Sequence, residues 1–265
     1  MLKDITLGQY YPSESVVHKL DPRTKILLTF LFIILIFLIK SLYGFVLLGI
    51  ITVLLSKIAK IPIKFLIKGL KPLVIIMVFT SVLNLFLTEG EIIWQFYFLT
   101  LTKEGLYLSV FMLVRVMFLV TGSSFLTYTT SPIAMTSGLE SLMKPLKKIK
   151  FPAHEIAMMM SIALRFIPTL IEETDKIMAA QKARGANLSE GNIIKRAKAL
   201  IPILIPLFIS AFRRADELAI AMESRCYNGG ENRTKLNALE FTKNDFSAVF
   251  ISVLGCIAVI AINFI

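Results

Sequence analysis

The sequence predicts an all-α polytopic membrane protein, with about five transmembrane helices and a cytoplasmic domain of long amphipathic helices. Three observations carry this prediction. Of the 265 residues, 56% are hydrophobic and only 18% are charged, and the mean hydropathy is +0.75. The apolar residues fall into separate runs, with basic residues between them. Ordinary soluble domains of this length are less apolar, so the chain belongs in a membrane.

Five apolar segments are candidates for transmembrane helices: 26–39, 42–55, 73–87, 105–128 and 246–265. The hydrocarbon core of a bilayer is roughly 30 Å thick and needs about 20 helical residues, so the last two segments fit and the first three are short. Flanking lysines that extend to the headgroups and local thinning can absorb this mismatch. One helix over 26–55 would be about 45 Å long with Lys40 near its middle, so we expect a tight hairpin at Lys40–Ser41 instead.

The distribution of Lys and Arg predicts the orientation. Basic residues are frequent in 1–25, in the connection 57–71 and in 129–235, and few lie in the other connections. Because basic residues favour the cytoplasmic side, the N-terminus is expected inside and the C-terminus outside. Region 26–128 then contains four transmembrane helices, 129–235 forms a cytoplasmic domain, and 246–265 is the final span. The net charge of +11 is explained by topology and by attraction to the lipid bilayer, and no nucleic acid is expected as a partner.

The chain shows no sign of a signal peptide, a disulfide or a metal site. The first apolar run begins at Ile26 after a polar stretch, so no cleavable signal peptide is expected. Cys226 is expected inside and Cys256 in the last span, where they cannot meet to form a disulfide. His18 and His154 have no neighbours at ligand spacing. We therefore expect neither a metal nor a cofactor in this chain.

Arg115 is the one ionisable residue well inside a predicted span. There it costs roughly 2.5–3.5 kcal/mol unless it is paired or hydrated. It could line a substrate or ion path, but an interhelical hydrogen bond to a group such as Asn84 or Ser81 is the favoured interpretation. The segment 92–101 is too short to cross and is rich in aromatic rings, so it is expected on the outer surface.

Three helices are predicted in the cytoplasmic domain, from Pro132 to about Leu146, from Pro152 to about Arg184 and from about Asn192 to Cys226. The first two begin at a proline, the first has lysines near its end, and the second has apolar residues at i, i+4 spacing. The third starts with basic residues and then becomes apolar. Pro168 should bend the second helix. The apolar stretch of the third is only 14 residues long, too short for a sixth span.

Two arginines stand where the second and third of these helices end, in the triplets Ala183-Arg184-Gly185 and Ser224-Arg225-Cys226. An offset of 41 residues places Arg184 on Arg225, and also matches Asp175 with Asp216 and Ala180 with Ala221. Small neighbours would let each helix end enter a groove, where the guanidinium reaches a carboxylate or carbonyls in forked geometry. The alternative is that both arginines only complement the helix dipole.

A methionine cluster, Met158, Met159 and Met160, lies near the start of the second helix, with Ile162 next on its apolar stripe. Methionines form a soft surface that can repack against more than one partner. Ordinary core filling is the alternative.

The chain resembles the transmembrane T component of energy-coupling factor transporters, which are vitamin and metal importers of the ATP-binding cassette superfamily. Two motifs carry the resemblance: Leu20-Asp21-Pro22-Arg23-Thr24-Lys25 ahead of the first span, and the paired arginine triplets. In that family the triplets, typically Ala-Arg-Gly, end two crossed coupling helices and fit grooves on two ATPase subunits. Ala183-Arg184-Gly185 matches this pattern, whereas Ser224-Arg225-Cys226 keeps the arginine and departs at both neighbours.

The resemblance also implies a substrate-binding membrane S component that rests on the coupling helices, with Met158, Met159, Met160 and Ile162 as expected contacts. ATP and Mg are expected in the two ABC-type ATPase subunits. The chain has no Gly-rich phosphate loop followed by Lys-Ser or Lys-Thr, and its spans carry no nucleophile–base set or carboxylate pair, so we do not expect an enzyme.

The predicted function is that of a non-catalytic coupling subunit in a prokaryotic cell membrane, which transmits ATP-driven motion to the S component for uptake of a vitamin or other micronutrient. A permease or channel whose own helices form the substrate path is the alternative. An intramembrane enzyme is a third class, and it would show turnover without partners.

Overall fold

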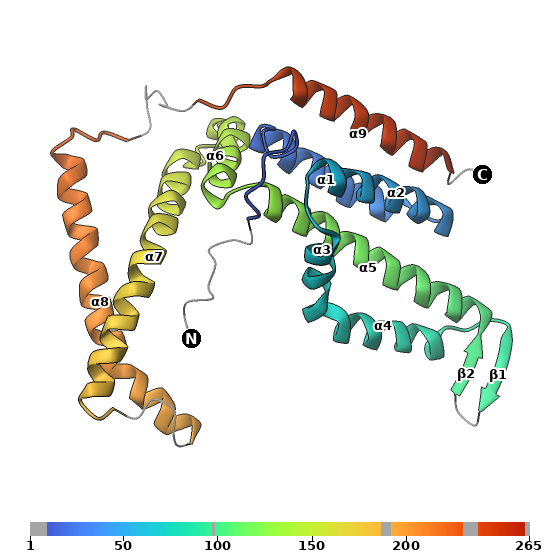
Figure 1. Cartoon of the computed structure of the whole chain (residues 1–265), viewed down its shortest axis with the longest axis horizontal. Coiled ribbons are helices and arrows are strands. Elements are labelled where there is room, and N and C mark those ends of the chain that lie inside the picture. The colour runs from blue at the N-terminus through green and yellow to red at the C-terminus, as the bar shows by residue number, and fades with distance from the viewer. Residues whose placement is uncertain (1–9, 97–98, 187–191, 230–237, 263–265) are drawn as a thin grey trace. The chain divides into compact units, whose positions relative to one another are not determined.

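The computed structural model describes residues 10–96, 99–186, 192–229 and 238–262, and most of its regular structure is helical (Figure 1). The chain divides into two compact units. The larger unit contains the described residues of 10–138 and 239–262, and the smaller contains those of 139–238. The predicted all-α membrane fold is confirmed, with one small β-hairpin added to it.

Among the described residues, the larger unit holds six complete helices, the hairpin and the first part of a helix that continues into the smaller unit. The helices are α1 (Pro22–Leu38), α2 (Leu42–Ile58), α3 (Ile63–Leu70), α4 (Val74–Leu87), α5 (Lys103–Thr129) and α9 (Lys243–Ile262), and the 3-10 turn Lys71–Leu73 joins α3 to α4. The strands are β1 (Ile92–Phe96) and β2 (Leu99–Thr102).

The predicted hairpin between the first two apolar segments is confirmed. α1 ends at Leu38, and α2 begins at Leu42 after Ser41, whose hydroxyl accepts a hydrogen bond from the Gly44 N–H at 3.4 Å. Such a serine cap satisfies an N–H that has no partner within the helix. α1 and α2 have 17 residues each, or about 25 Å, so they are short for a bilayer as the sequence indicated.

Four helices are long and apolar enough to cross a membrane, judged by length and composition: Ile63–Leu87, Lys103–Thr129, Ala153–Ala183 and Lys243–Ile262. Leu42–Ile58 is a shorter apolar helix. The predicted segment 73–87 is thus the second part of a longer helix that begins at Ile63. Ala153–Ala183 belongs to the stretch that the sequence assigns to the cytoplasm, and that assignment stays a prediction.

The core of the larger unit lies where α1, α2, α5 and α9 meet. Phe45 of α2 stacks on Phe118 of α5 at 5.8 Å between ring centroids, and Val259 of α9 is fully buried in the same cluster. Close approach of α1 and α5 requires a glycine. A Cβ at Gly122 would lie 2.4 Å from the Phe32 ring, so a larger residue there would push the helices apart.

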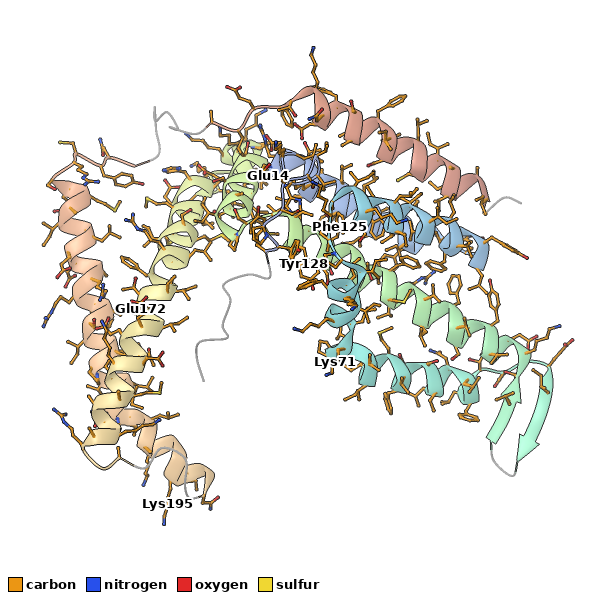
Figure 2. The ribbon with its side chains drawn as sticks, in the orientation of Figure 1. Glu14, Lys71, Phe125, Tyr128, Glu172 and Lys195 are labelled. Carbon is orange, nitrogen blue, oxygen red and sulfur yellow. The ribbon has the colours of Figure 1, made fainter. Side chains whose placement is uncertain are left out.

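A second small cluster lies at the other end of α5. Tyr128 is buried, and its hydroxyl donates to the Phe65 carbonyl of α3 at 3.1 Å. Figure 2 labels Tyr128 and its neighbour Phe125 on the last turns of α5, where Phe125 packs against this cluster.

The segment 92–101, predicted as a surface segment, forms the antiparallel hairpin of β1 and β2, with Phe96 opposite Leu99 and an irregularity between Ile92 and Trp94. The sequence analysis did not predict these strands. A two-stranded hairpin is marginal alone, but here Thr102 Oγ1 donates to the Thr88 carbonyl at 2.8 Å and ties the hairpin to the end of α4.

The smaller unit is built from α7 (Ala153–Ala183) and α8 (Ile193–Glu223), preceded by the end of α6 (Pro132–Met143) and the 3-10 helix Lys144–Ile149. The three helices predicted for this stretch are confirmed within three residues at each end. α7 continues through Pro168, and α8 continues through Pro202 and Pro206.

Candidate functional site

The end of α7 places the first arginine in a regular capping motif. Arg184 is the C-cap residue, and Gly185 follows with a φ of 85°. The Gly185 N–H donates to the Lys182 carbonyl at 3.0 Å, and the Ala186 N–H donates to the Gln181 carbonyl at 3.0 Å. This pair of bonds is a Schellman motif, which satisfies carbonyls that the helix leaves open.

The end of α8 repeats this motif at the second triplet. Arg225 again precedes a residue in left-handed conformation, here Cys226 with a φ of 56°. The Cys226 N–H donates to the Glu223 carbonyl at 2.9 Å, and the Tyr227 N–H donates to the Met222 carbonyl at 3.0 Å. The two arginines are therefore equivalent in backbone geometry as well as in sequence offset, even though a cysteine stands in the second motif where glycine is preferred.

Both triplets are open to solvent. Ala183, Arg184 and Gly185 are exposed, as are Ser224, Arg225 and Cys226. Among the residues that the structure describes, neither guanidinium has an ion-pair partner. A Cβ added to Gly185 would meet nothing within 4 Å. Each helix thus ends in a slim tip with a free cation, a shape suited to a groove lined with acceptors.

α7 and α8 pack against each other through a polar contact about two thirds of the way along each helix. Arg214 Nη2 donates to Glu173 Oε2 at 3.0 Å, and the Ser210 hydroxyl donates to the other oxygen of Glu173. Nearer the end of α7, Gln181 Nε2 donates to the Pro202 carbonyl at 3.3 Å. That carbonyl has no helical partner because residue 206, four positions on, is also a proline and has no N–H.

These contacts make α7 and α8 an antiparallel pair with arms of equal length. Glu173 precedes Arg184 by eleven residues, and Arg214 precedes Arg225 by eleven residues. Each arm from the Glu173–Arg214 ion pair to its arginine is therefore about 16 Å long. Because the helices run in opposite directions (Figure 1), the two tips lie at opposite ends of the pair.

Two side chains of the methionine cluster are exposed and one is half-buried. Met159 and Met160 are 58% and 38% exposed, whereas Met158 and Ile162 are half-buried. Soft side chains at positions 159 and 160 are thus available for contact.

Comparison with known proteins decides the family. The family model described as "CbiQ: Cobalt transport protein" matches residues 13–236. A protein of Ruminiclostridium cellulolyticum named "Energy-coupling factor transporter transmembrane protein EcfT" is 53% identical over 265 residues, which cover 100% of this chain and 99% of the relative. Proteins of the same name from Thermosediminibacter oceani and Bacillus subtilis are 53% and 48% identical, over 100% and 94% of this chain and 100% and 94% of each relative. The chain belongs to the EcfT family.

As a member of the EcfT family, the protein is the transmembrane component of an energy-coupling factor transporter, and the names of these relatives do not describe an enzyme. The resemblance inferred from the paired arginines and from Leu20-Asp21-Pro22-Arg23-Thr24-Lys25 is confirmed. The roles of the individual residues in the triplets stay predictions, as does the S-component contact at residues 158–160 and 162.

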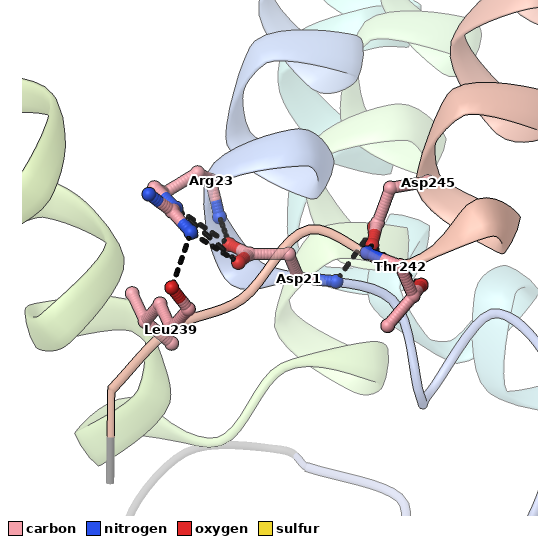
Figure 3. A network of polar contacts seen from close by, with 5 residues as sticks. All are labelled: Asp21, Arg23, Leu239, Thr242 and Asp245. Carbon is pink, nitrogen blue, oxygen red and sulfur yellow. Dashed lines mark hydrogen bonds and ion pairs between the residues drawn. The ribbon is translucent and has the colours of Figure 1, made fainter.

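In this EcfT-family chain, Asp21 and Arg23 of the hexapeptide form a polar clasp with Thr242 and Asp245, in which the two aspartates are buried (Figure 3). Asp245 Oδ1 accepts from the Asp21 N–H at 2.8 Å, and its Oδ2 accepts from the Thr242 N–H at 2.8 Å and from the Thr242 hydroxyl at 2.7 Å. Asp21 also caps α1 by accepting from the Arg23 N–H at 2.8 Å. The role of Asp245 was not predicted from residues 20–25, because Asp245 lies 224 residues from Asp21 along the chain.

The clasp places the starts of α1 and α9 together. Arg23 extends from it to the Leu239 carbonyl at 2.8 Å and lies over the Phe241 ring at 4.0 Å from the centroid. Lys25 Nζ donates to the Thr129 carbonyl at the end of α5, at 2.9 Å. The starts of α1 and α9 and the end of α5 therefore lie at the same end of the larger unit, and the assignment of that end to the cytoplasm stays a prediction.

His18 packs behind Lys25 in the segment before α1. Its Nδ1 lies 2.7 Å from the Ser15 hydroxyl, its Nε2 donates to the Tyr11 carbonyl at 3.0 Å, and Lys25 Nζ donates to the His18 carbonyl at 2.9 Å. Burial lowers the pKa of His18 against the opposing effect of the Tyr11 hydrogen bond, and the Lys25 charge adds to the lowering. The neutral ring is thus the form that fits this site.

Arg115 makes an interhelical hydrogen bond, but not to the groups named from the sequence. Its Nη2 donates to the Ile39 carbonyl at 3.0 Å, and its guanidinium lies 4.6 Å from the Phe111 ring centroid. Ser81 bonds instead to Ser109, and Asn84 to the Thr80 carbonyl. Ile39 is the C-cap of α1, so the cation lies at a helix end whose carbonyls have no intrahelical partner.

In the part of the chain that the structure describes, no three His, Cys, Asp or Glu side chains gather where they could hold a metal ion. Cys226 and Cys256 are both free thiols.

Proposed function

We propose that the chain is the coupling subunit of a multi-subunit importer in a prokaryotic cell membrane. Two ABC-type ATPase subunits, which hold ATP and Mg, grip the tips at Arg184 and Arg225, and the α7–α8 pair transmits their motion to a substrate-binding S component. The single observation that carries the proposal is the repeated motif: two exposed arginines on identical helix ends, eleven residues from a shared ion pair.

The symmetry of the pair supports a lever. Two similar tips at opposite ends of an antiparallel pair suit two similar sockets on two similar subunits. Motion of one tip reaches the other through the Glu173–Arg214 contact. The S component, which carries the vitamin or other micronutrient, would rest on the exposed Met159 and Met160.

The experiment compares Arg184→Ala and Arg225→Ala in the assembled transporter. Loss of one groove-bound arginine is expected to weaken ATPase docking by about 2–5 kcal/mol, because partner charges are left unpaired. Co-purification of the ATPase subunits and ATP-dependent uptake are measured, and the double variant should lose more than either single variant. Arg165→Ala and Arg213→Ala serve as controls, since both are exposed arginines of α7 and α8 that lie away from the tips.

Unchanged uptake in both tip variants would overturn the proposal. Substrate binding by the purified chain alone, or conductance without nucleotide, would instead support a permease or channel.

A further inference from the structure

Residues 144–152, here named the basic turn, join α6 to α7 and are exposed throughout. The turn lies outside the four helices that could cross a membrane. It contains no acidic residue, and its large side chains are either basic or apolar. Its basic residues are Lys144, Lys147, Lys148 and Lys150, and its apolar residues are Leu146, Ile149 and Phe151, which are 41%, 77% and 38% exposed.

The backbone sorts these side chains onto different faces. Lys144–Ile149 is a 3-10 helix with Pro145 in its first turn. In a 3-10 helix the residues at i and i+3 eclipse each other. Leu146 and Ile149 therefore form one apolar edge, and Lys144 and Lys147 form a neighbouring basic edge.

Contacts at its base hold the turn in this shape. The Phe151 N–H donates to the Leu146 carbonyl at 3.3 Å, and the Lys150 N–H donates to the Lys147 carbonyl at 3.0 Å. Next to the turn, His154 Nδ1 at the start of α7 lies 3.0 Å from a carboxylate oxygen of Glu140 in α6. The Glu140 side chain is only 12% exposed, and the next acidic residue after the turn is Glu155 in the first turn of α7.

We propose that the basic turn lies on the membrane surface and binds the headgroups of anionic phospholipids. Ile149 and Leu146 enter the boundary between headgroups and acyl chains, while the lysine stems extend to the phosphates. Four lysines in a segment whose sequence contains no acidic residue match an anionic lipid surface, and each lysine near such a surface shifts the binding equilibrium about fivefold. This interaction goes beyond the proposed coupling function, because it anchors the α6–α7 connection whether or not ATPases are bound.

The test uses the full-length chain in nanodiscs, with an indole as the reporter. Ile149→Trp is combined with Trp94→Phe, which removes the only other tryptophan. Quenching by brominated phosphatidylcholine is then measured with and without phosphatidylglycerol. We expect stronger quenching in the discs that contain phosphatidylglycerol, and a loss of this increment at high salt because the charges are screened.

Charge variants separate the basic turn from the general positive charge of the chain. Replacing its four lysines with Gln should abolish the increment, and replacing them with Arg should keep it. The matched control replaces four exposed lysines of α7 and α8 with Gln, namely Lys176, Lys182, Lys195 and Lys198 (Lys195 is labelled in Figure 2), and should leave the increment in place.

Equal quenching with and without phosphatidylglycerol overturns the proposal, and so does an increment that the Gln variant of the turn retains. An indole that lipid does not quench, but that ATPase subunits protect, identifies a protein as the occupant and also overturns it. ATPase co-purification is recorded on the same variants. Its loss with the lipid increment intact would count against the coupling function alone.

Discussion

The ion pair between Glu173 and Arg214 is the contact whose removal tests the lever most directly. The two atoms lie 3.0 Å apart, and the side chains are 23% and 36% exposed, respectively. In surroundings of intermediate dielectric such a pair attracts by about 4 kcal/mol, but desolvation and side-chain ordering offset most of this. Because both groups are partly open to water, we expect a net coupling of about 1 kcal/mol.

The perturbation is a double-mutant cycle of Glu173→Gln, Arg214→Gln and the combination of both. Gln at position 173 can still accept from Ser210, so the cycle isolates the charge pair. Each single variant should lower the Tm of the purified chain by about 2–4 °C, and the double variant should lose less than the sum. In the assembled transporter, both single variants should keep their ATPase subunits, because the tips are intact, yet transport less substrate per ATP hydrolysed.

Two results would refute this reasoning. Single-variant effects that add to within about 0.3 kcal/mol would show that the pair contributes no coupling. An unchanged ratio of uptake to ATP hydrolysis, in variants with a measured loss of stability, would show that the contact holds the helices together without transmitting motion.

Two further predictions concern the helix ends and the segment before α1. Cys226→Gly should stabilise the chain by about 0.5–1 kcal/mol and Gly185→Ala should destabilise it by about 1–2 kcal/mol, because only glycine adopts a positive φ without strain. Thermal unfolding measures both changes. Equal Tm changes of the same sign would contradict the capping geometry. His18 has a lowered pKa in the folded chain, so the unfolded chain binds more protons and stability is lost as the pH falls below about 6.5. The difference in Tm between pH 7 and pH 5 should be smaller in His18→Gln, and an identical difference in the two proteins would exclude His18 as its source.

Much of the helix architecture could be predicted from local signals. Composition decided the membrane class, because a chain this apolar cannot form an ordinary soluble domain. Local signals located helix ends within a few residues, as the expected hairpin at Lys40–Ser41 does for α1 and α2 and the first arginine triplet does for α7. The pairing of Arg184 with Arg225 also came from the sequence alone, because both motifs are local and an offset alignment reveals them.

A side chain's partner could not be predicted where that partner is an ordinary backbone group or a residue far away in the sequence. Arg115 was expected to bond a polar side chain, but its acceptor is the Ile39 carbonyl, and every residue of the chain carries such a carbonyl. The strands 92–96 and 99–102 were missed because aromatic residues near a membrane surface suit several conformations, and a hairpin is stable only with the neighbours that hold it.

By itself, the sequence determined the class of the protein, its apolar segments and the two arginine-tipped helix ends, since these depend on residues close together along the chain. The tertiary structure alone decided that Asp245 closes on Asp21 and that Glu173 meets Arg214 halfway between the tips. These two contacts depend on which faces of distant helices pack together. The free energy of that packing depends on both helices at once, so neither segment's sequence determines it alone.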